Sequence, residues 1–185
     1  MIDRNQTKCD LYVFGAQEIP VEGIVEWEVM IQRTLGRKYI LLHAVRFGTL
    51  HLAIFIRSQL QSYCSAVDWG VLSVRAISTI KTKGVAACAV QIFGTKFIFM
   101  TSHLTVSTYR KISDDQYELP IIKAGEGEKN LANRILNYRT IREKLRLRRS
   151  KAMEVKIEHK NLAKKYNFNI EEFDTVFWFG DLNFR

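Results

Sequence analysis

The chain has 185 residues, of which 47% are hydrophobic and 25% charged, and its formal net charge is +9 at neutral pH. This composition excludes a largely disordered chain and fits one globular domain or part of a larger one. The positive charge favours anionic partners, such as nucleic acid, phosphorylated small molecules or an acidic membrane surface. No run approaches the roughly 20 apolar residues of a membrane span, and the opening stretch MIDRNQTKCD lacks the apolar core of a signal peptide.

The beginning of the chain predicts a strand followed by a helix. The strand candidate, DLYVFGAQE, is a short apolar run that ends in Glu18. The next segment predicts a helix that ends at Gly36, because apolar residues recur at helical spacing at Ile24, Trp27, Ile31 and Leu35.

Residues 38–104 predict a β-sheet. Five short β-rich runs follow one another: KYILLHAV, TLHLAIFIR, SVRAIST, VAACAVQIF and KFIFMTSH. The break FGTK between the last two predicts a hairpin at Gly94 and Thr95.

A long loop, a helix and a final strand are predicted for the rest of the chain. Residues 105–128 have mixed polarity and no sustained period, which indicates a loop. Residues 129–165 show helical spacing and many Lys and Arg side chains, so this helix presents either a membrane-facing basic patch or a solvated surface. Residues 175–179 predict the last strand.

Three of the apolar runs end in polar side chains that suit metal or phosphate binding. They are Glu18, His103, and Asp181 with Asn183. If the three strands lie side by side, their ends meet at one rim of the sheet, where catalytic groups collect in α/β proteins. Alternation along the last strand directs Asp181 and Asn183 to the same side.

These residue types suit metal-assisted attack on a phosphate. One carboxylate binds a hard Mg²⁺ ion, a second orients and deprotonates water, and an imidazole and an amide neutralise charge on phosphoryl oxygens. Taken singly, each has a structural alternative: a solvated surface acid, a histidine in a capped turn, and an ordinary Gly-Asp-x-Asn turn. The remaining histidines, His43, His51 and His159, are predicted at surface positions.

The final motif FWFGDLNFR resembles the signature of the inositol polyphosphate 5-phosphatases. Similarity extends through DLYVFGAQE, FIRSQL, STIKTKGVAACAVQIFGTKFIFMTSHLT and NLANRILNYRTI, and so covers most of the chain. Among the branches of this family, the chain is most similar to type IV, which acts on phosphoinositides. The resemblance implies an α/β fold, part of the four-layered α/β sandwich of the DNase I-like endonuclease/exonuclease/phosphatase superfamily. It also implies that residues 1–185 are an incomplete catalytic domain, mostly its N-terminal half.

The resemblance also implies roles for individual residues. Glu18 would bind Mg²⁺, Asp181 would activate the attacking water, Asn183 would contact the scissile phosphate, and His103 would stabilise or protonate its oxygens. The residues implied as further phosphate contacts are Lys83 and Arg185. The implied reaction is hydrolysis of the 5-phosphate of a phosphoinositide head group. The implied partners are such head groups and an anionic membrane surface, with no nucleic acid, in a cytoplasmic protein peripheral to Golgi or ciliary membranes.

The family pattern includes three segments that this sequence lacks. They are an early Trp-Asn pair, a Pro-x-Trp-Cys-Asp-Arg segment and a later Ser-Asp-His segment. We therefore expect the chain as given to expose the apolar face of a single sheet, to be poorly stable and to be weakly active or inactive. Two other functions stay open: a Mg²⁺-dependent nuclease of the same superfamily, and a non-catalytic binding module.

Overall fold

The structure is a computed structural model that describes residues 9–75, 82–105, 110–113, 116–118, 127–149, 166–167 and 169–183. Its helices are α1 (Ile24–Leu35) and α2 (Gly127–Lys144), with short 3-10 turns η1 (Val21–Gly23), η2 (Ser58–Tyr63) and η4 (Ile170–Glu172). Its strands are β1 (Leu11–Ala16), β2 (Tyr39–Phe47), β3 (Leu50–Arg57), β4 (Asp68–Ser73), β5 (Gly84–Ile92), β6 (Thr95–His103), β7 (Arg110–Ser113), β8 (Gln116–Glu118), β9 (Arg146–Arg149), β10 (Tyr166–Asn167) and β11 (Thr175–Asp181).

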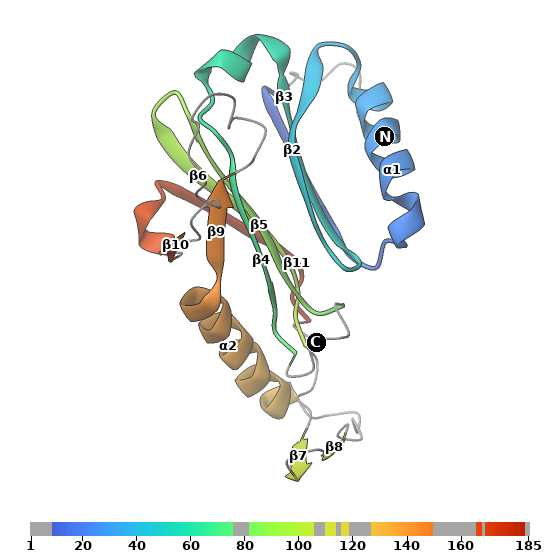
Figure 1. The fold of residues 1–185 in the computed structure, drawn as a ribbon, viewed down its shortest axis with the longest axis vertical. Helices are drawn as coiled ribbons and strands as arrows, with labels where there is room; N and C mark the ends of the chain where they lie inside the picture. The colour runs from blue at the N-terminus through green and yellow to red at the C-terminus, as the bar shows by residue number, and fades with distance from the viewer. Residues whose placement is uncertain are drawn as a thin grey trace, which may run out of the picture.

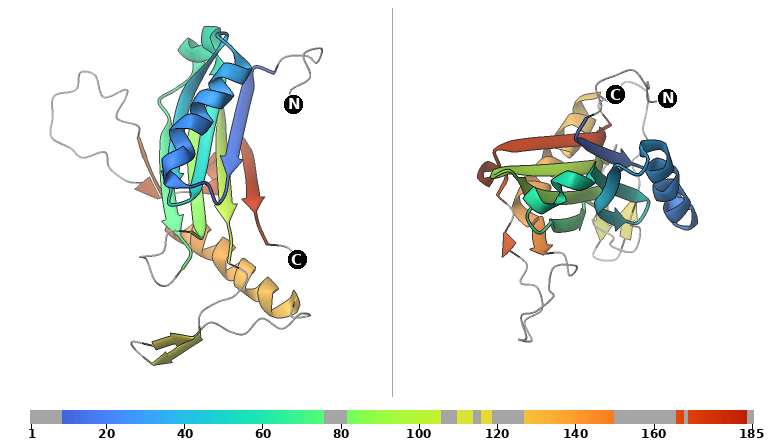
Figure 2. Two further views of the ribbon diagram at one scale, coloured as in Figure 1. Left: turned by 90° about the vertical axis from the view of Figure 1, so that its right-hand side faces the viewer. Right: turned by 90° about the horizontal axis from the view of Figure 1, so that it is seen from above.

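Two sheets face each other, with α1 and α2 on opposite outer faces (Figures 1 and 2). The smaller sheet has the strand order β1-β3-β2, and the larger has the order β10-β9-β4-β5-β6-β11. Within the larger sheet, β11 and β6 pair in parallel, and the other neighbouring strands pair antiparallel. The prediction of a single sheet is wrong, because η2 carries the chain from β3 of one sheet to β4 of the other.

The predicted first helix is confirmed, and it covers the smaller sheet. Trp27 and Ile31 of α1 pack against Ala53 and Phe55 of β3. The helix ends where Gly36 adopts a φ of +82°, a conformation that glycine adopts without steric cost, and its N–H donates to the Gln32 carbonyl.

The strand β3 is buried on both faces, because helix α1 covers one face and the larger sheet covers the other. Leu52 and Ile54 of β3 pack between the sheets with Cys88 and Phe99. A third cluster joins the other face of the larger sheet to the end of α2 through Ile98, Met100, Ile141, Leu145 and Leu147. The layers are therefore helix, sheet, sheet and helix, as the four-layered sandwich requires.

The expected uncovered face of a single sheet is not observed, since the two sheets cover each other. The large apolar side chains that remain exposed lie mainly on α1 (Val25, Val29, Met30), α2 (Leu131, Ile135, Leu136, Tyr138) and β11 (Val176, Phe177).

The predicted helix of residues 129–165 ends at Lys144, and the prediction is wrong for residues 145–149. The chain continues as β9, in which Leu147 is fully buried and is flanked by the less buried Arg146 and Arg148. This alternation has the period of a strand, and β9 pairs with the edge of β4. Residues 150–165 lie outside the described part of the chain.

Two further predictions need correction. The long loop of residues 105–128 contains the paired strands β7 and β8, and α2 begins within it at Gly127. The strand predicted at SVRAIST lies earlier, at β4, and residues 76–79 are outside the described ranges. The hairpin between β5 and β6 is confirmed, with positive φ angles at Phe93 and Gly94.

His51 is buried rather than at the surface. Its side chain is enclosed between β3 and α1, where its Nε2 lies 2.7 Å from Glu28 Oε1 and its ring meets Trp27 edge to face. Burial lowers the pKa of His51 from its usual value, and the neighbouring Glu28 raises it in part. His43 is half-buried, and His159 lies outside the described residues.

Among the described residues, neither helix combines the length and apolar character that a membrane crossing requires.

The two sheets approach closely at Gly15 of β1. A Cβ atom at this position would lie 2.3 Å from the Phe179 ring and 2.6 Å from the Thr101 hydroxyl. Glycine is thus required here for the end of β1 to lie against β6 and β11.

We expect Gly15→Ala to lower the free energy of unfolding by about 1–3 kcal/mol, because the added methyl group overpacks the contact between the sheets. Urea denaturation measures this change. Gly23→Ala is the matched control, since an added Cβ there meets no atom within 4 Å, and its effect should stay below about 1 kcal/mol. Equal stability of the two variants would contradict a steric requirement at Gly15.

Candidate active site

The polar ends of β6 and β11 lie side by side. The parallel register places Asp181 opposite His103, so both strands deliver their last residues to the same rim of the larger sheet. The neighbouring strand β5 begins there too, with Gly84 opposite His103, which brings Lys83 to the rim.

Glu18 reaches this rim from the smaller sheet. The prediction that its strand lies beside the other two is wrong, but the rim still receives the side chain. Gln17 donates a hydrogen bond to Thr101 Oγ1 of β6 at 2.9 Å, and the Ile19 N–H donates to the Thr49 carbonyl at 3.2 Å. Between these two anchors, Glu18 has a φ of +61°, which is uncommon for a residue with a side chain.

His103 stands at the centre of the group. Its Nε2 lies 3.2 Å from Asp181 Oδ2 and 3.9 Å from Glu18 Oε1, and Lys83 Nζ contacts the same nitrogen. The imidazole is almost completely buried, whereas the carboxylates of Glu18 and Asp181 are 76% and 36% exposed. The structure thus gathers three of the sequence-predicted residues, Glu18, Lys83 and Asp181, around the buried ring of a fourth, His103, with the two carboxylates open to solvent.

Asn183 is held by a turn beyond the end of β11. Its backbone N–H donates to Asp181 Oδ1 at 3.1 Å, and its side-chain amide donates to the Leu104 carbonyl at 2.7 Å. Its φ is +54°, a left-handed conformation that asparagine tolerates better than most residues. The expected alternation along a strand is therefore wrong for Asn183, but both side chains do lie at the rim.

Helix α2 supports this turn from behind, which the sequence did not predict. Arg134, only 8% exposed, donates to the Asn183 carbonyl at 2.9 Å. One turn further, the buried Asn137 donates to Thr105 Oγ1 at 2.6 Å. The sequence does contain a sign of this contact. Arg134 and Asn137 are three residues apart, which places both polar side chains on the same side of the helix as the buried Ile141.

Burial and neighbouring charges set the ionisation of the site. Burial lowers the pKa of His103, the Lys83 cation lowers it further, and Asp181 and Glu18 oppose this change. Burial also lowers the pKa of Lys83, again against the two carboxylates. The lowered pKa favours the neutral imidazole of His103, which can donate or accept a hydrogen bond.

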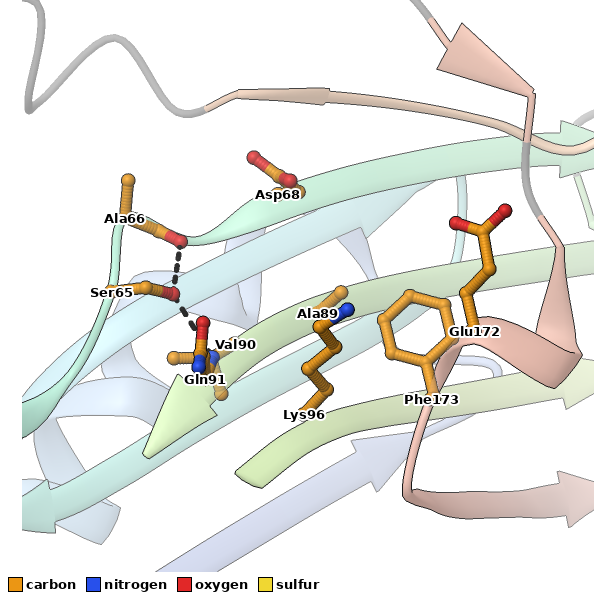
Figure 3. A pocket seen from close by; sticks show the side chains of 9 residues that line it. All are labelled: Ser65, Ala66, Asp68, Ala89, Val90, Gln91, Lys96, Glu172 and Phe173. Carbon is orange, nitrogen blue, oxygen red and sulfur yellow. Dashed lines mark hydrogen bonds between the residues drawn. The ribbon is translucent and has the colours of Figure 1, made fainter. Parts of the chain in front are cut away.

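The last predicted residue, Arg185, lies outside the described part of the chain. A separate open pocket of about 380 Å³ lies at the other end of the larger sheet, near the start of β6 at Lys96, where Phe173 and Glu172 form one wall (Figure 3). None of the predicted site residues lines it. The rim around His103 is therefore the candidate active site.

Comparisons with known proteins agree with this geometry. The family described as Endonuclease/Exonuclease/phosphatase family 2 matches residues 1–185. Phosphatidylinositol polyphosphate 5-phosphatase type IV from rat and from human are each 36% identical over 177 residues, which is 95% of this chain and 23% of each relative.

A solved structure confirms the fold. The inositol polyphosphate 5-phosphatase domain of SpSynaptojanin, in complex with inositol (1,4)-bisphosphate and calcium ion, superposes with a TM-score of 0.67 at 24% identity. The match covers 97% of this chain and 45% of that domain's chain. The predicted α/β fold of the DNase I-like class is thereby confirmed, and the family match over residues 1–185 confirms the predicted endonuclease/exonuclease/phosphatase superfamily. The chain spans about a quarter of the length of the curated type IV relatives.

We expect Lys83→Met to raise the pKa of His103, because the substitution removes a cation that disfavours a second positive charge beside it. NMR titration of the histidine ring measures the shift. Lys96→Met is the control, since Lys96 lies near the opposite end of β6 and should leave the pKa unchanged. An unchanged or lower pKa in Lys83→Met would contradict the electrostatic role of Lys83.

Arg134→Met should lower the free energy of unfolding by about 1–3 kcal/mol, since the Asn183 carbonyl loses its buried donor. Chemical denaturation tests this value. Arg139→Met, an exposed position on the same helix, should change it by less than about 0.5 kcal/mol. If both variants are equally stable, the contact between α2 and the turn contributes nothing measurable.

Proposed function

Because the chain belongs to the endonuclease/exonuclease/phosphatase family, we propose that it carries catalytic residues of a Mg²⁺-dependent phosphoinositide 5-phosphatase. The observation that carries this proposal is the convergence of Glu18, Lys83, His103 and Asp181 on one rim, from two sheets. The proposed domain assignment is that residues 1–185 form part of the catalytic domain of that enzyme.

The donor chemistry of the rim fits a hard divalent cation. Mg²⁺ in proteins is held by one or two carboxylates and keeps several water or phosphate ligands. The Glu18 carboxylate is exposed at the rim and supplies one such ligand. Among the described residues, no three His, Cys, Asp or Glu side chains form a complete metal site. When bound, Mg²⁺ supplies positive charge to the phosphoryl oxygens.

Asp181 and His103 are placed for proton transfer. Asp181 is anchored through Oδ1 to the Asn183 backbone, and its Oδ2 faces the imidazole. In the proposed reaction, a water oxygen forms a bond to phosphorus as the bond from phosphorus to the inositol oxygen breaks. Asp181 accepts the proton of the water, the departing inositol oxygen takes up a proton from solvent to become a hydroxyl, and His103 hydrogen-bonds the phosphoryl oxygens.

The remaining residues bind the phosphate. Lys83 supplies a cation beside His103. The Asn183 amide uses one N–H on the Leu104 carbonyl, which fixes the side chain and leaves its second N–H to donate to a phosphoryl oxygen. We assign Arg185 a further phosphate contact.

The substrate class follows from the relatives. The type IV proteins are named as phosphatidylinositol polyphosphate 5-phosphatases, and they share more than a third of the aligned residues with this chain. This favours phosphoinositide head groups over nucleic acid, although the charge of +9 suits both. We place the complete protein at the cytoplasmic surface of membranes, of the Golgi or primary cilium, as the resemblance to the type IV branch implies.

Phosphate release from inositol 1,4,5-trisphosphate in the presence of Mg²⁺, measured with the complete protein that contains this chain, tests the proposal. We expect Asp181→Asn and Glu18→Gln each to reduce the rate by about 10²–10⁴-fold, since each removes a carboxylate that acts in the reaction. Removal of the metal with EDTA should have a similar effect. Glu172→Gln, in the pocket at the opposite end of the larger sheet, is the matched control and should leave the rate unchanged.

Two outcomes would contradict the proposal. Nicking of plasmid DNA without phosphate release would identify a nuclease. Binding of inositol phosphates without any turnover, unchanged by Asp181→Asn, would identify a binding module.

A further inference from the structure

The outer surface of α2 is unusually apolar for a solvent-facing helix. Leu131, Ile135 and Leu136 are 47%, 42% and 54% exposed, on adjacent turns. Apolar side chains in such a cluster favour contact with a partner or a lipid surface over water.

This apolar surface is attached directly to the candidate active site. Arg134 and Asn137, from the same two turns, form the hydrogen bonds to Asn183 and Thr105 on the inner side of the helix. The ribbon views place α2 at the end of the molecule where β6 and β11 terminate (Figures 1 and 2). Whatever contacts the outer surface of α2 therefore also lies at the active-site end.

The charge of the same segment selects an anionic partner. Helix α2 contains five Lys and Arg against two Glu, a net charge of +3. Arg139, Arg142 and Lys144 are exposed and continue the helix beyond the apolar cluster. Arg142 also contacts Glu171 at 3.2 Å; among the α2 side chains that the structure describes, Arg139 and Lys144 are the other exposed cations.

Helix α1 provides an internal comparison. It too exposes apolar side chains, with Val25 at 66% and Met30 at 57%. Its twelve residues, however, contain two Glu and one Arg and so carry a net charge of −1. Apolar exposure and positive charge coincide on α2 and not on α1.

We propose that the α2 face, defined as Leu131, Ile135, Leu136 and Arg139, docks on an anionic lipid membrane. This inference rests on the proposed function, because a phosphoinositide substrate presents its phosphates at the surface of a bilayer. The apolar side chains enter the boundary between head groups and acyl chains, and the neighbouring cations bind anionic head groups. The docked α2 face holds the rim of His103 and Asp181 at the level of the head groups.

Flotation with phosphatidylcholine vesicles that contain phosphatidylserine but no phosphoinositide tests the surface by itself. We expect the chain to bind these vesicles and to bind less at high salt. Leu136→Glu should weaken binding to the vesicles roughly tenfold. It replaces a leucine that enters the membrane in the docked state by a negative charge near an anionic surface. Met30→Glu, at a similarly exposed apolar position on α1, is the matched control and should bind like the unmodified chain.

Three results would overturn the proposal. They are no binding to anionic vesicles, equal binding of Leu136→Glu and the unmodified chain, or a dimer that Leu136→Glu converts to a monomer. The last would identify a second copy of the chain as the occupant. Phosphate release from soluble inositol 1,4,5-trisphosphate should be unchanged by Leu136→Glu. Loss of the proposed activity therefore remains distinguishable from loss of docking.

Discussion

The parallel pairing of β11 with β6 is the constraint on which the candidate site depends. It sets Asp181 beside His103, because parallel strands bring their carboxyl ends to one edge. Trp178 strengthens this pairing by donating to Ser102 Oγ at 2.8 Å across the two strands. Gly180, with a φ of +120°, lies where a Cβ would meet the Ser102 carbonyl at 2.3 Å. The strands thus approach closely just before the acid and the imidazole.

The second sheet completes the site through packing. Gly15 lets β1 approach Phe179 and Thr101, and Gln17 then bonds to Thr101. Glu18 follows within a few residues and has little freedom to move away from His103. The carboxylates of the candidate site, Glu18 and Asp181, come from the two different sheets. The packing between the sheets therefore sets the distance between these carboxylates. This explains why the small volume of Gly15 matters as much to the site as any charged group.

The sequence singled out residues that the structure brings together at one rim, but it did not predict the arrangement of the strands that carry them. Glu18, His103 and Asp181 were recognisable because each ends an apolar run, a local feature. The division into two sheets was not predictable locally, since η2 contains neither Gly nor Pro to mark the change of sheet. β9 was misassigned because alternation over four residues is too short to distinguish from the helical pattern before it. Arg134 and Asn137 were missed because their partners, Asn183 and Thr105, are 49 and 32 residues away.

Helix α2 contacts the candidate site with one side and exposes apolar side chains on the other. Its inner side carries two buried polar side chains, Arg134 and Asn137, among apolar neighbours. Burial of these groups costs free energy unless each forms a hydrogen bond to a partner. Those partners are the backbone and side-chain groups that hold the ends of β6 and β11. Its outer side carries the opposite anomaly, apolar groups in water. The buried polar side chains on the inner side find their partners at Asn183 and Thr105. A lipid surface would remove the exposed apolar side chains on the outer side from water. With the proposed docking, one helix with these two sides would couple the position of the candidate site to the membrane surface.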